Sequence, residues 1–97
     1  MAERTWWLYV LECEGGSLYT GIATDVIRRY GEHCRGKAAI YTRLKPPVRI
    51  VGAVAIGTRS AALKAEYAFK QLAAREKWTR AAQMEAPKTY TRDLTDF

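Results

Sequence analysis

The feature that most constrains the fold of this chain is an unbroken apolar and aromatic run near its start, Trp6-Trp7-Leu8-Tyr9-Val10-Leu11. Both alternating sets of side chains in this run are apolar, so a strand made from it must be buried on both faces. Aromatic and branched residues also favour extended backbone. The run therefore predicts a central strand that is covered on both of its sides.

A second strand is expected directly after a short turn. Residues 13–17 (Cys-Glu-Gly-Gly-Ser) supply turn residues, and residues 18–22 form another apolar segment, which together are typical of a β-hairpin. If the loop is odd-numbered and centred on Glu14, Tyr9 and Tyr19 lie directly opposite one another on the same face of the sheet. The sequence favours this register without fixing it.

A helix is expected from Asp25 to Arg35. Thr24 and Asp25 offer side-chain oxygens to the first backbone amides, and the negative charge of Asp25 suits the positive end of the helix dipole. Gly36 suits the C-terminal cap. Three residues recur at helical spacing and are expected to face the core: Ile27, Tyr30 and Cys34.

The rest of the chain predicts one more strand and further helix. Residues 37–47 are interpreted as a basic loop that ends at two prolines, and residues 49–57 as a third strand rich in Val, Ile and Ala. Thr58 or Ser60 should cap a second long helix that reaches about residues 75–77. A short helix and then a loose tail are expected after Trp78.

This order of elements predicts an α+β fold in which helices pack on a small, mostly antiparallel sheet. With 97 residues the chain has room for one domain, which we place at residues 1–85 with a tail at 86–97. Its two cysteines and single histidine cannot complete a Cys/His zinc set, and no apolar run approaches the length of a membrane span. Without a secretory signal, we expect a cytoplasmic protein with free thiols.

The positive charge is concentrated in the middle of the sequence. Of the net charge of +6, the greater part comes from residues 26–65, where nine Lys and Arg residues face Glu32 as the one acidic residue. A local positive field of this kind is what a phosphate backbone selects. Anionic small molecules, or a solvated basic face that only keeps the protein in solution, are the alternatives.

Glu66 stands out on the second long helix. Its spacing from Ala62, Phe69 and Ala73 puts it on or beside the apolar face that should pack against the sheet. A buried carboxylate without a partner is costly, so it needs a basic side chain, a set of hydrogen bonds or a metal ion. An ion pair with an arginine of the first helix and a metal site are both open.

Other polar residues are ambiguous when they are taken singly. Arg29 and His33, four residues apart, point the same way from the first helix, at the margin between helix and sheet. Either could be structural, and Tyr9 and Tyr19 could simply be core aromatics. Gly21 could form the turn or allow close approach of another group.

The order of these residues is more specific than any one of them. Tyr9 is followed by Tyr19-Thr20-Gly21, then by Asp25, Arg28-Arg29 and His33, by Tyr41-Thr42-Arg43, and by Ala65-Glu66-Tyr67. This arrangement resembles the GIY-YIG nuclease superfamily, and within it the small stand-alone bacterial branch of uncharacterised proteins. The resemblance extends from residue 6 to about residue 72 and is carried most specifically by residues 18–30.

The resemblance implies a three-stranded antiparallel sheet flanked by helices, and one divalent-metal site that cleaves DNA phosphodiesters. Trp7-Leu8-Tyr9 takes the first motif position, of which it keeps only the tyrosine, and Tyr19-Thr20-Gly21 takes the second. The catalytic residues that the resemblance implies are Tyr9, Tyr19, Arg29, His33, Tyr41 and Glu66. Some relatives also use a late asparagine, and this chain contains no asparagine.

Phosphodiester hydrolysis fits these residue types. Glu66 would hold one Mg²⁺ or Mn²⁺ ion, which keeps most of its waters and also binds phosphate. Arg29 would fork onto phosphate oxygens. Tyr9, with its pKa lowered by Arg29 and the metal, would deprotonate the attacking water, and His33 would relay the proton from near its midpoint at neutral pH. Tyr19 and Tyr41 would position phosphate or water.

We expect recognition of nucleic-acid shape, because no module that reads base sequence is present. The expected substrate is branched, nicked or single-stranded DNA in repair or recombination, with RNA left open and a protein partner that could supply specificity. The residues expected to grip the backbone are Arg28, Arg35, Lys37, Arg43, Lys45 and Arg49. The alternatives are a catalytically inactive nucleic-acid-binding module that acts with a partner, and an interaction protein whose basic face docks on an acidic partner.

Overall fold

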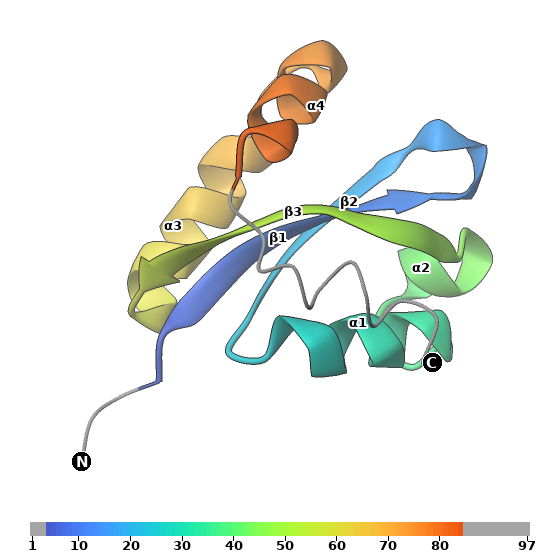
Figure 1. Cartoon of the computed structure of the whole chain (residues 1–97), viewed down its shortest axis with the longest axis horizontal. Coiled ribbons are helices and arrows are strands. Elements are labelled where there is room, and N and C mark those ends of the chain that lie inside the picture. The colour runs from blue at the N-terminus through green and yellow to red at the C-terminus, as the bar shows by residue number, and fades with distance from the viewer. Residues whose placement is uncertain (1–3, 85–97) are drawn as a thin grey trace.

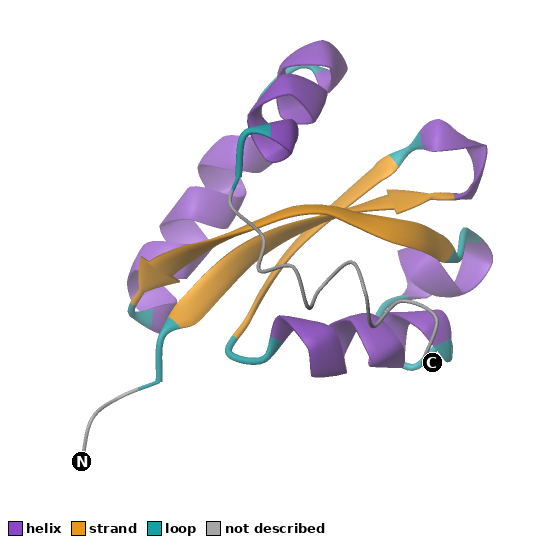
Figure 2. Cartoon of the chain, in the orientation of Figure 1, coloured by secondary structure: helices purple, strands orange, loops and turns teal. Residues whose placement is uncertain are grey.

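The computed structural model of the chain describes residues 4–84, which form a three-stranded antiparallel sheet with helices on both faces (Figures 1 and 2). The strand order is β2-β1-β3. Strand β1 (Trp6–Cys13) lies in the centre, between β2 (Leu18–Ala23) and β3 (Pro47–Gly57). The predicted α+β class and the central position of the first strand are confirmed.

Two apolar layers cover the two faces of the sheet. Alternate residues of β1 enter different layers: Tyr9, Leu11 and Cys13 pack with α1, whereas Leu8 and Val10 pack with α3 and α4. This is the burial on both faces that the uninterrupted apolar run predicts. No helix within residues 4–84 has the length and apolar character needed to cross a membrane.

The hairpin register is shifted by two residues from the expected one, because the centre of the turn lies one residue later. A single turn of 3₁₀ helix, η1 (Glu14–Gly16), connects β1 to β2, and Gly15 and Gly16 both adopt positive φ angles of 86° and 83°. Because glycine tolerates this conformation, the turn is centred on Gly15 and not on Glu14. Tyr9 therefore pairs with Gly21, and Tyr19, on the same face, pairs with Leu11.

Helix α1 (Val26–Cys34) begins where it was expected. The side chain of Asp25 accepts a hydrogen bond from the backbone N–H of Arg28 at 3.1 Å, and Gly36 takes a positive φ of 73° after the helix. The inward face differs in part. Four residues of this helix are buried, Val26, Tyr30, Gly31 and His33, while Ile27 is half-buried and Cys34 is exposed.

The segment expected to be a basic loop contains a short helix, α2 (Ile40–Leu44), and strand β3 begins at Pro47. Arg49 is therefore a strand residue. Five helical residues give too short a periodic pattern to recognise from sequence. Thr42, the buried residue of α2, attaches it to the rest of the domain.

Thr58 caps helix α3 (Arg59–Lys70), as expected, by accepting a hydrogen bond from the N–H of Ala61 at 3.1 Å. The helix ends at Lys70, several residues earlier than predicted, and a separate helix α4 (Ala74–Ala82) follows. Helix α4 packs closely on β3, where a Cβ on Gly52 would clash with the carbonyl oxygen of Ala81. The predicted boundary at residue 85 and the tail lie outside the described residues.

Candidate active site

Tyr9 occupies the middle of the central strand on the face covered by α1, and its side chain is only 1% exposed. Its ring lies across Gly21 on the neighbouring strand. A Cβ built on Gly21 would come within 2.5 Å of the Tyr9 hydroxyl, so a residue with a side chain cannot stand there without displacing the tyrosine. Of the two interpretations of Gly21, close approach is the one that the structure supports.

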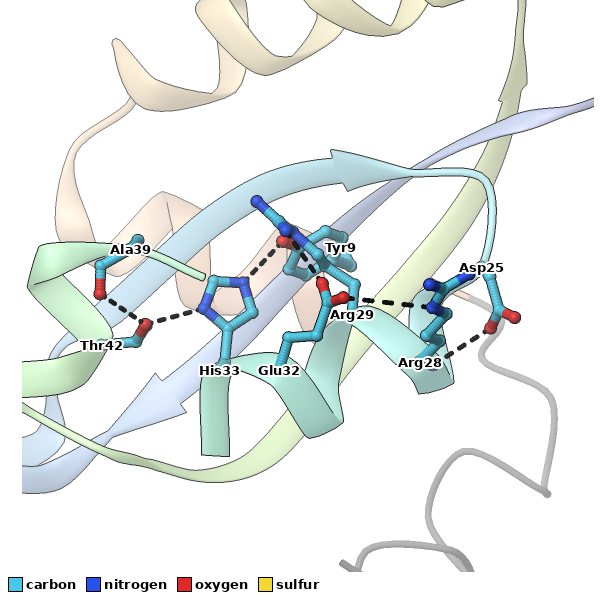
Figure 3. Close-up of polar contacts among 8 residues, drawn as sticks. All are labelled: Tyr9, Asp25, Arg28, Arg29, Glu32, His33, Ala39 and Thr42. Atoms are coloured by element: carbon cyan, nitrogen blue, oxygen red, sulfur yellow. Dashed lines mark hydrogen bonds and ion pairs between the residues drawn. The ribbon is translucent and has the colours of Figure 1, made fainter. Parts of the chain in front are cut away.

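The Tyr9 hydroxyl begins a chain of buried hydrogen bonds (Figure 3). Its oxygen lies 2.8 Å from Nε2 of His33, and Nδ1 of His33 lies 2.7 Å from Oγ1 of Thr42. Thr42 in turn donates to the carbonyl oxygen of Ala39 at 3.2 Å. His33 and Thr42 are both completely buried. The expectation that His33 lies at the helix–sheet margin is therefore wrong, because its ring points inward.

The donor count favours one direction for this chain. A threonine hydroxyl has one proton, and when Thr42 gives it to Ala39, Thr42 accepts from His33. In this direction Nδ1 of His33 carries the proton, and Nε2 offers a lone pair to the hydroxyl of Tyr9. The chain runs from Tyr9 through His33 and Thr42 to Ala39, and it requires a neutral imidazole.

The surroundings of His33 keep it neutral. Burial, and second the charge of Arg29, lower its pKa to about 4, with only a small opposing effect of Glu32. The expectation of a histidine near its midpoint at neutral pH is wrong, because the ring is removed from water. His33 is thus a hydrogen-bond acceptor for Tyr9 at physiological pH.

Tyr9 also holds its proton firmly in the free protein. Burial raises the pKa of its hydroxyl well above the usual value, and the neighbouring Tyr19 and the carboxylate of Glu66 act in the same direction. A hydrogen bond from Arg29 and its positive charge oppose them and lower the pKa. The direction predicted for Arg29 is correct, but burial outweighs it.

Arg29 lies on α1 beside Tyr9 and is anchored on its own helix. Its Nη1 donates to the carboxylate of Glu32 at 2.9 Å, and the same carboxylate lies 4.0 Å from Nε of Arg28. The Arg29 side chain remains 39% exposed. It therefore has donors near the Tyr9 hydroxyl and access to solvent, as a phosphate-binding arginine needs.

Tyr19 and Tyr41 continue the site toward the surface. The ring of Tyr19 meets that of His33 edge to face, with centroids 4.9 Å apart, and the rings of Tyr19 and Tyr41 lie 5.9 Å apart. Tyr41, on α2, is exposed, and Nζ of Lys45 lies 5.9 Å from its ring centroid. The structure thus places Tyr9, His33, Tyr19 and Tyr41 in one connected row.

Glu66 lies on α3, the helix on the other side of the sheet, within electrostatic range of Tyr9. Its side chain is 19% exposed and pairs with Nζ of Lys70 on the same helix at 3.3 Å. The alternative of an ion pair with an arginine of the first helix is wrong, because Arg29 pairs with Glu32. The negative charge of Glu66 raises the pKa of Tyr9, which places both residues in one electrostatic environment.

A metal site at Glu66 would have few protein ligands. Within residues 4–84, no three His, Cys, Asp or Glu side chains form a group that could hold an ion. This donor set fits Mg²⁺, which is commonly held by one or two carboxylates, several waters and substrate phosphates. It does not fit an ion that requires a closed set of protein ligands.

The six residues expected to bind nucleic acid are all exposed and come from α1, the segments on either side of α2, α2 itself and β3. Arg28 lies at the start of α1, and Arg49 is paired on the sheet with Glu12 at 2.7 Å. The side chain of Arg43 packs over Gly36. The six residues are Arg28, Arg35, Lys37, Arg43, Lys45 and Arg49.

Two residues of the site were not predicted from sequence, Thr42 and Glu32. Thr42 sits in a segment without visible helical periodicity, so nothing marked its side chain as buried. Glu32 follows Arg29 at a spacing that favours an ion pair on a helix, and this signal could have identified it.

Known proteins share this fold and sequence. The GIY-YIG catalytic domain matches residues 5–80. A UPF0213 protein of Cupriavidus pinatubonensis is 52% identical over 90% of this chain and 97% of its own length. The UPF0213 protein YhbQ of Salmonella typhimurium is 43% identical over 84% of this chain and 81% of its own length.

Two solution NMR structures are also similar. A UPF0213 protein from Bacillus halodurans has a TM-score of 0.53 at 38% identity, covering 94% of this chain and 97% of that one. A protein from E. faecalis has a TM-score of 0.55 at 40% identity, covering 80% and 83%. Together with the motif residues gathered around Tyr9, these similarities place the chain in the GIY-YIG nuclease family, among the small bacterial UPF0213 proteins.

Proposed function

We propose that this protein is a divalent-metal-dependent endonuclease that hydrolyses phosphodiester bonds in DNA. The observation that carries the proposal is the buried hydrogen-bond chain from Tyr9 through His33 to Thr42, beside an arginine that is open to solvent. A tyrosine needed only for packing would not require a neutral imidazole of fixed tautomer behind its hydroxyl. The family supports the same chemistry.

In the proposed mechanism Tyr9 acts as the general base. With its O–H bonded to His33 and one lone pair accepting from Arg29, the Tyr9 oxygen would use its other lone pair to accept a proton from the attacking water. As that proton arrives, the original phenol proton moves to Nε2 of His33. The positive charge of Arg29 lowers the pKa of His33, and a phosphate bound by Arg29 would offset that charge. The proton transfer from Tyr9 to His33 would then become easier.

The other site residues act on charge and position. Arg29 would bind two phosphate oxygens and stabilise the charge that develops on them. Glu66 would hold one Mg²⁺ or Mn²⁺ after its contact with Lys70 is released, and Tyr19 and Tyr41 would orient phosphate or water. The ion, when bound, polarises the phosphoryl oxygen and neutralises the leaving group.

The substrate is proposed to be branched, nicked or single-stranded DNA, in repair or recombination. The exposed cations on α1, α2 and β3 can contact phosphates, which positions a nucleic acid but does not read its bases. Specificity would then come from shape or from a protein partner. RNA is the alternative substrate, and its cleavage is to be compared with that of DNA.

The experiment that tests the proposal is cleavage of labelled flap, nicked, branched, single-stranded and plain duplex DNA, and of matched RNA, with Mg²⁺, Mn²⁺ or EDTA. Glu66→Gln should abolish cleavage and retain binding. Glu76→Gln is the matched control, because Glu76 also pairs with a residue four positions on, Arg80, at 3.0 Å, but on the surface of α4. Binding without cleavage by the wild-type protein would instead identify a binding module.

A further inference from the structure

A groove of about 420 Å³ opens beside the candidate active site, at the end of the sheet where β1 begins and β2 ends. Four arginines line it: Arg4, Arg28, Arg29 and Arg59. Arg29 also belongs to the candidate active site, so the groove and the site have this lining residue in common. The groove is therefore a continuation of the site and not a separate cavity.

The acidic residues of the groove are already engaged. Asp25 caps α1 by accepting a hydrogen bond from the N–H of Arg28, and Glu32 lies against the side chains of Arg28 and Arg29. Arg4 and Arg59 form no ion pair with any carboxylate of residues 4–84. The groove consequently has excess positive charge, concentrated at these two side chains.

Arg59 is held in place at the mouth of the groove. Its guanidinium lies 5.6 Å from the ring centroid of Trp6, a cation–π contact that restrains the side chain and leaves its N–H groups available. Arg59, Leu63 and Glu66 follow one another at helical spacing on α3. One face of α3 thus leads from the groove to the proposed metal ligand.

We propose that this groove binds the phosphodiester backbone of the substrate strand on one side of the bond that is cut, with Arg59 and Arg4 as its phosphate contacts. The inference rests on the proposed nuclease function and adds a subsite to it. The exposed Tyr41 on α2, and Lys45 directly after α2, lie at the opposite end of the sheet, because α2 precedes the start of β3 and α3 follows its end (Figure 1). A strand that enters past α2 and crosses Arg29 therefore leaves through the groove.

The test measures binding of a short fluorescein-labelled single-stranded DNA in EDTA, where cleavage cannot occur, over a series of salt concentrations. The variants are Arg4→Gln, Arg59→Gln and their combination. The matched control is Arg75→Gln, which also removes one positive charge. Arg75 is an exposed residue of α4 that does not line the groove. Circular dichroism and thermal unfolding verify that each variant is folded.

Each groove variant should weaken binding by about 3- to 10-fold at low salt and reduce the slope of log K against log salt by about 0.7, the value for one phosphate contact on a single strand. The double variant should lose twice that slope, and Arg75→Gln should keep the wild-type values. Wild-type affinity and slope in the double variant would overturn the groove and leave the nuclease proposal intact. No DNA binding by the wild-type protein would overturn both.

A second measurement does not depend on the variants. In ¹H–¹⁵N spectra of the wild-type protein with the same DNA and EDTA, the indole N–H of Trp6 and the Nε–H of Arg59 should shift along with Arg29. Shifts confined to Arg29 and α2 would place the strand elsewhere and overturn the groove.

Discussion

The hydroxyl oxygen of Tyr9 lies 2.8 Å from Nε2 of His33, and both groups are buried between the sheet and α1. When His33 donates its other N–H to Thr42, the tyrosine is the donor in this contact. The phenol oxygen also accepts from Arg29, and its remaining lone pair is then the one that a substrate water would use. A hydrogen bond that runs from Tyr9 to His33 prepares the tyrosine for proton transfer, which a tyrosine that serves only in packing would not need.

Thr42 is expected to set the tautomer of His33. Thr42→Val keeps the shape but removes the acceptor for Nδ1–H, which should cost about 1–3 kcal/mol of stability and lower kcat more than it changes KM. ¹⁵N NMR of the His33 ring should show the proton on Nδ1 in the wild-type protein and a mixture of tautomers in the variant.

Thr42→Ser keeps the hydroxyl and should restore both the tautomer and the rate. A wild-type protein with the ring proton on Nε2 would reverse the direction of the chain and remove its proposed role.

Acidification should destabilise the protein through His33, the one histidine in the sequence. The unfolded residue binds a proton below pH ~6.5, whereas the folded one, with a pKa of about 4, does not, so stability is lost as the pH falls from about 6.5 toward 4. The full loss is of the order of 3 kcal/mol. Urea unfolding at pH 7.5, 6 and 5 measures it.

His33→Gln should flatten the profile between pH 6.5 and 4.5. Glu32, whose pKa is lowered by Arg29, contributes stability that is lost only below about 4.5, and it serves as an internal reference that the variant retains. If the unfolding free energy of the variant depended on pH as steeply as that of the wild type, His33 would not have a lowered pKa in the folded protein.

Gly21→Ala should displace the ring of Tyr9, because the new Cβ would lie 2.5 Å from the hydroxyl. We expect a loss of about 1–3 kcal/mol in stability and a large loss of cleavage by the folded fraction. Gly52→Ala is the comparison, since its Cβ meets the backbone of α4 on the opposite face of the sheet.

Both glycine variants should unfold more easily, but only Gly21→Ala should lose its rate per folded molecule, measured below each unfolding transition. Equal rates in the two folded variants would show that the position of Tyr9 over Gly21 is not required.

The central strand and the helix starts could be predicted from local chemistry. The apolar run that begins at Trp6 has one stable environment, and Asp25 and Thr58 cap helices through contacts within three residues. The hairpin register could not, because both Gly15 and its neighbour Gly16 can take positive φ, and their conformations decide which residue stands opposite Tyr9.

The motif order names residues that the structure brings together, but their ionisation could not be predicted from sequence. The motif order identifies Tyr9, Arg29, His33 and Glu66, yet the shifts in pKa come from burial, which depends on how α1 and α2 close over the ring of His33. Thr42 was missed for the same reason. Its importance lies in a contact between two helices that sequence spacing does not reveal.

The most direct test of this account is the single-turnover rate of DNA cleavage by Tyr9→Phe, compared with Tyr19→Phe, Tyr41→Phe and Tyr30→Phe. Tyr30 is a buried tyrosine of α1 outside the hydrogen-bond chain, so its variant controls for the loss of a buried hydroxyl. With Mg²⁺ and the best substrate, Tyr9→Phe should be at least ~100-fold slower than wild type. Tyr30→Phe should cut at the wild-type rate, with Tyr19→Phe and Tyr41→Phe in between. A folded Tyr9→Phe protein that cuts as fast as the wild type would contradict the assignment of Tyr9 as the general base.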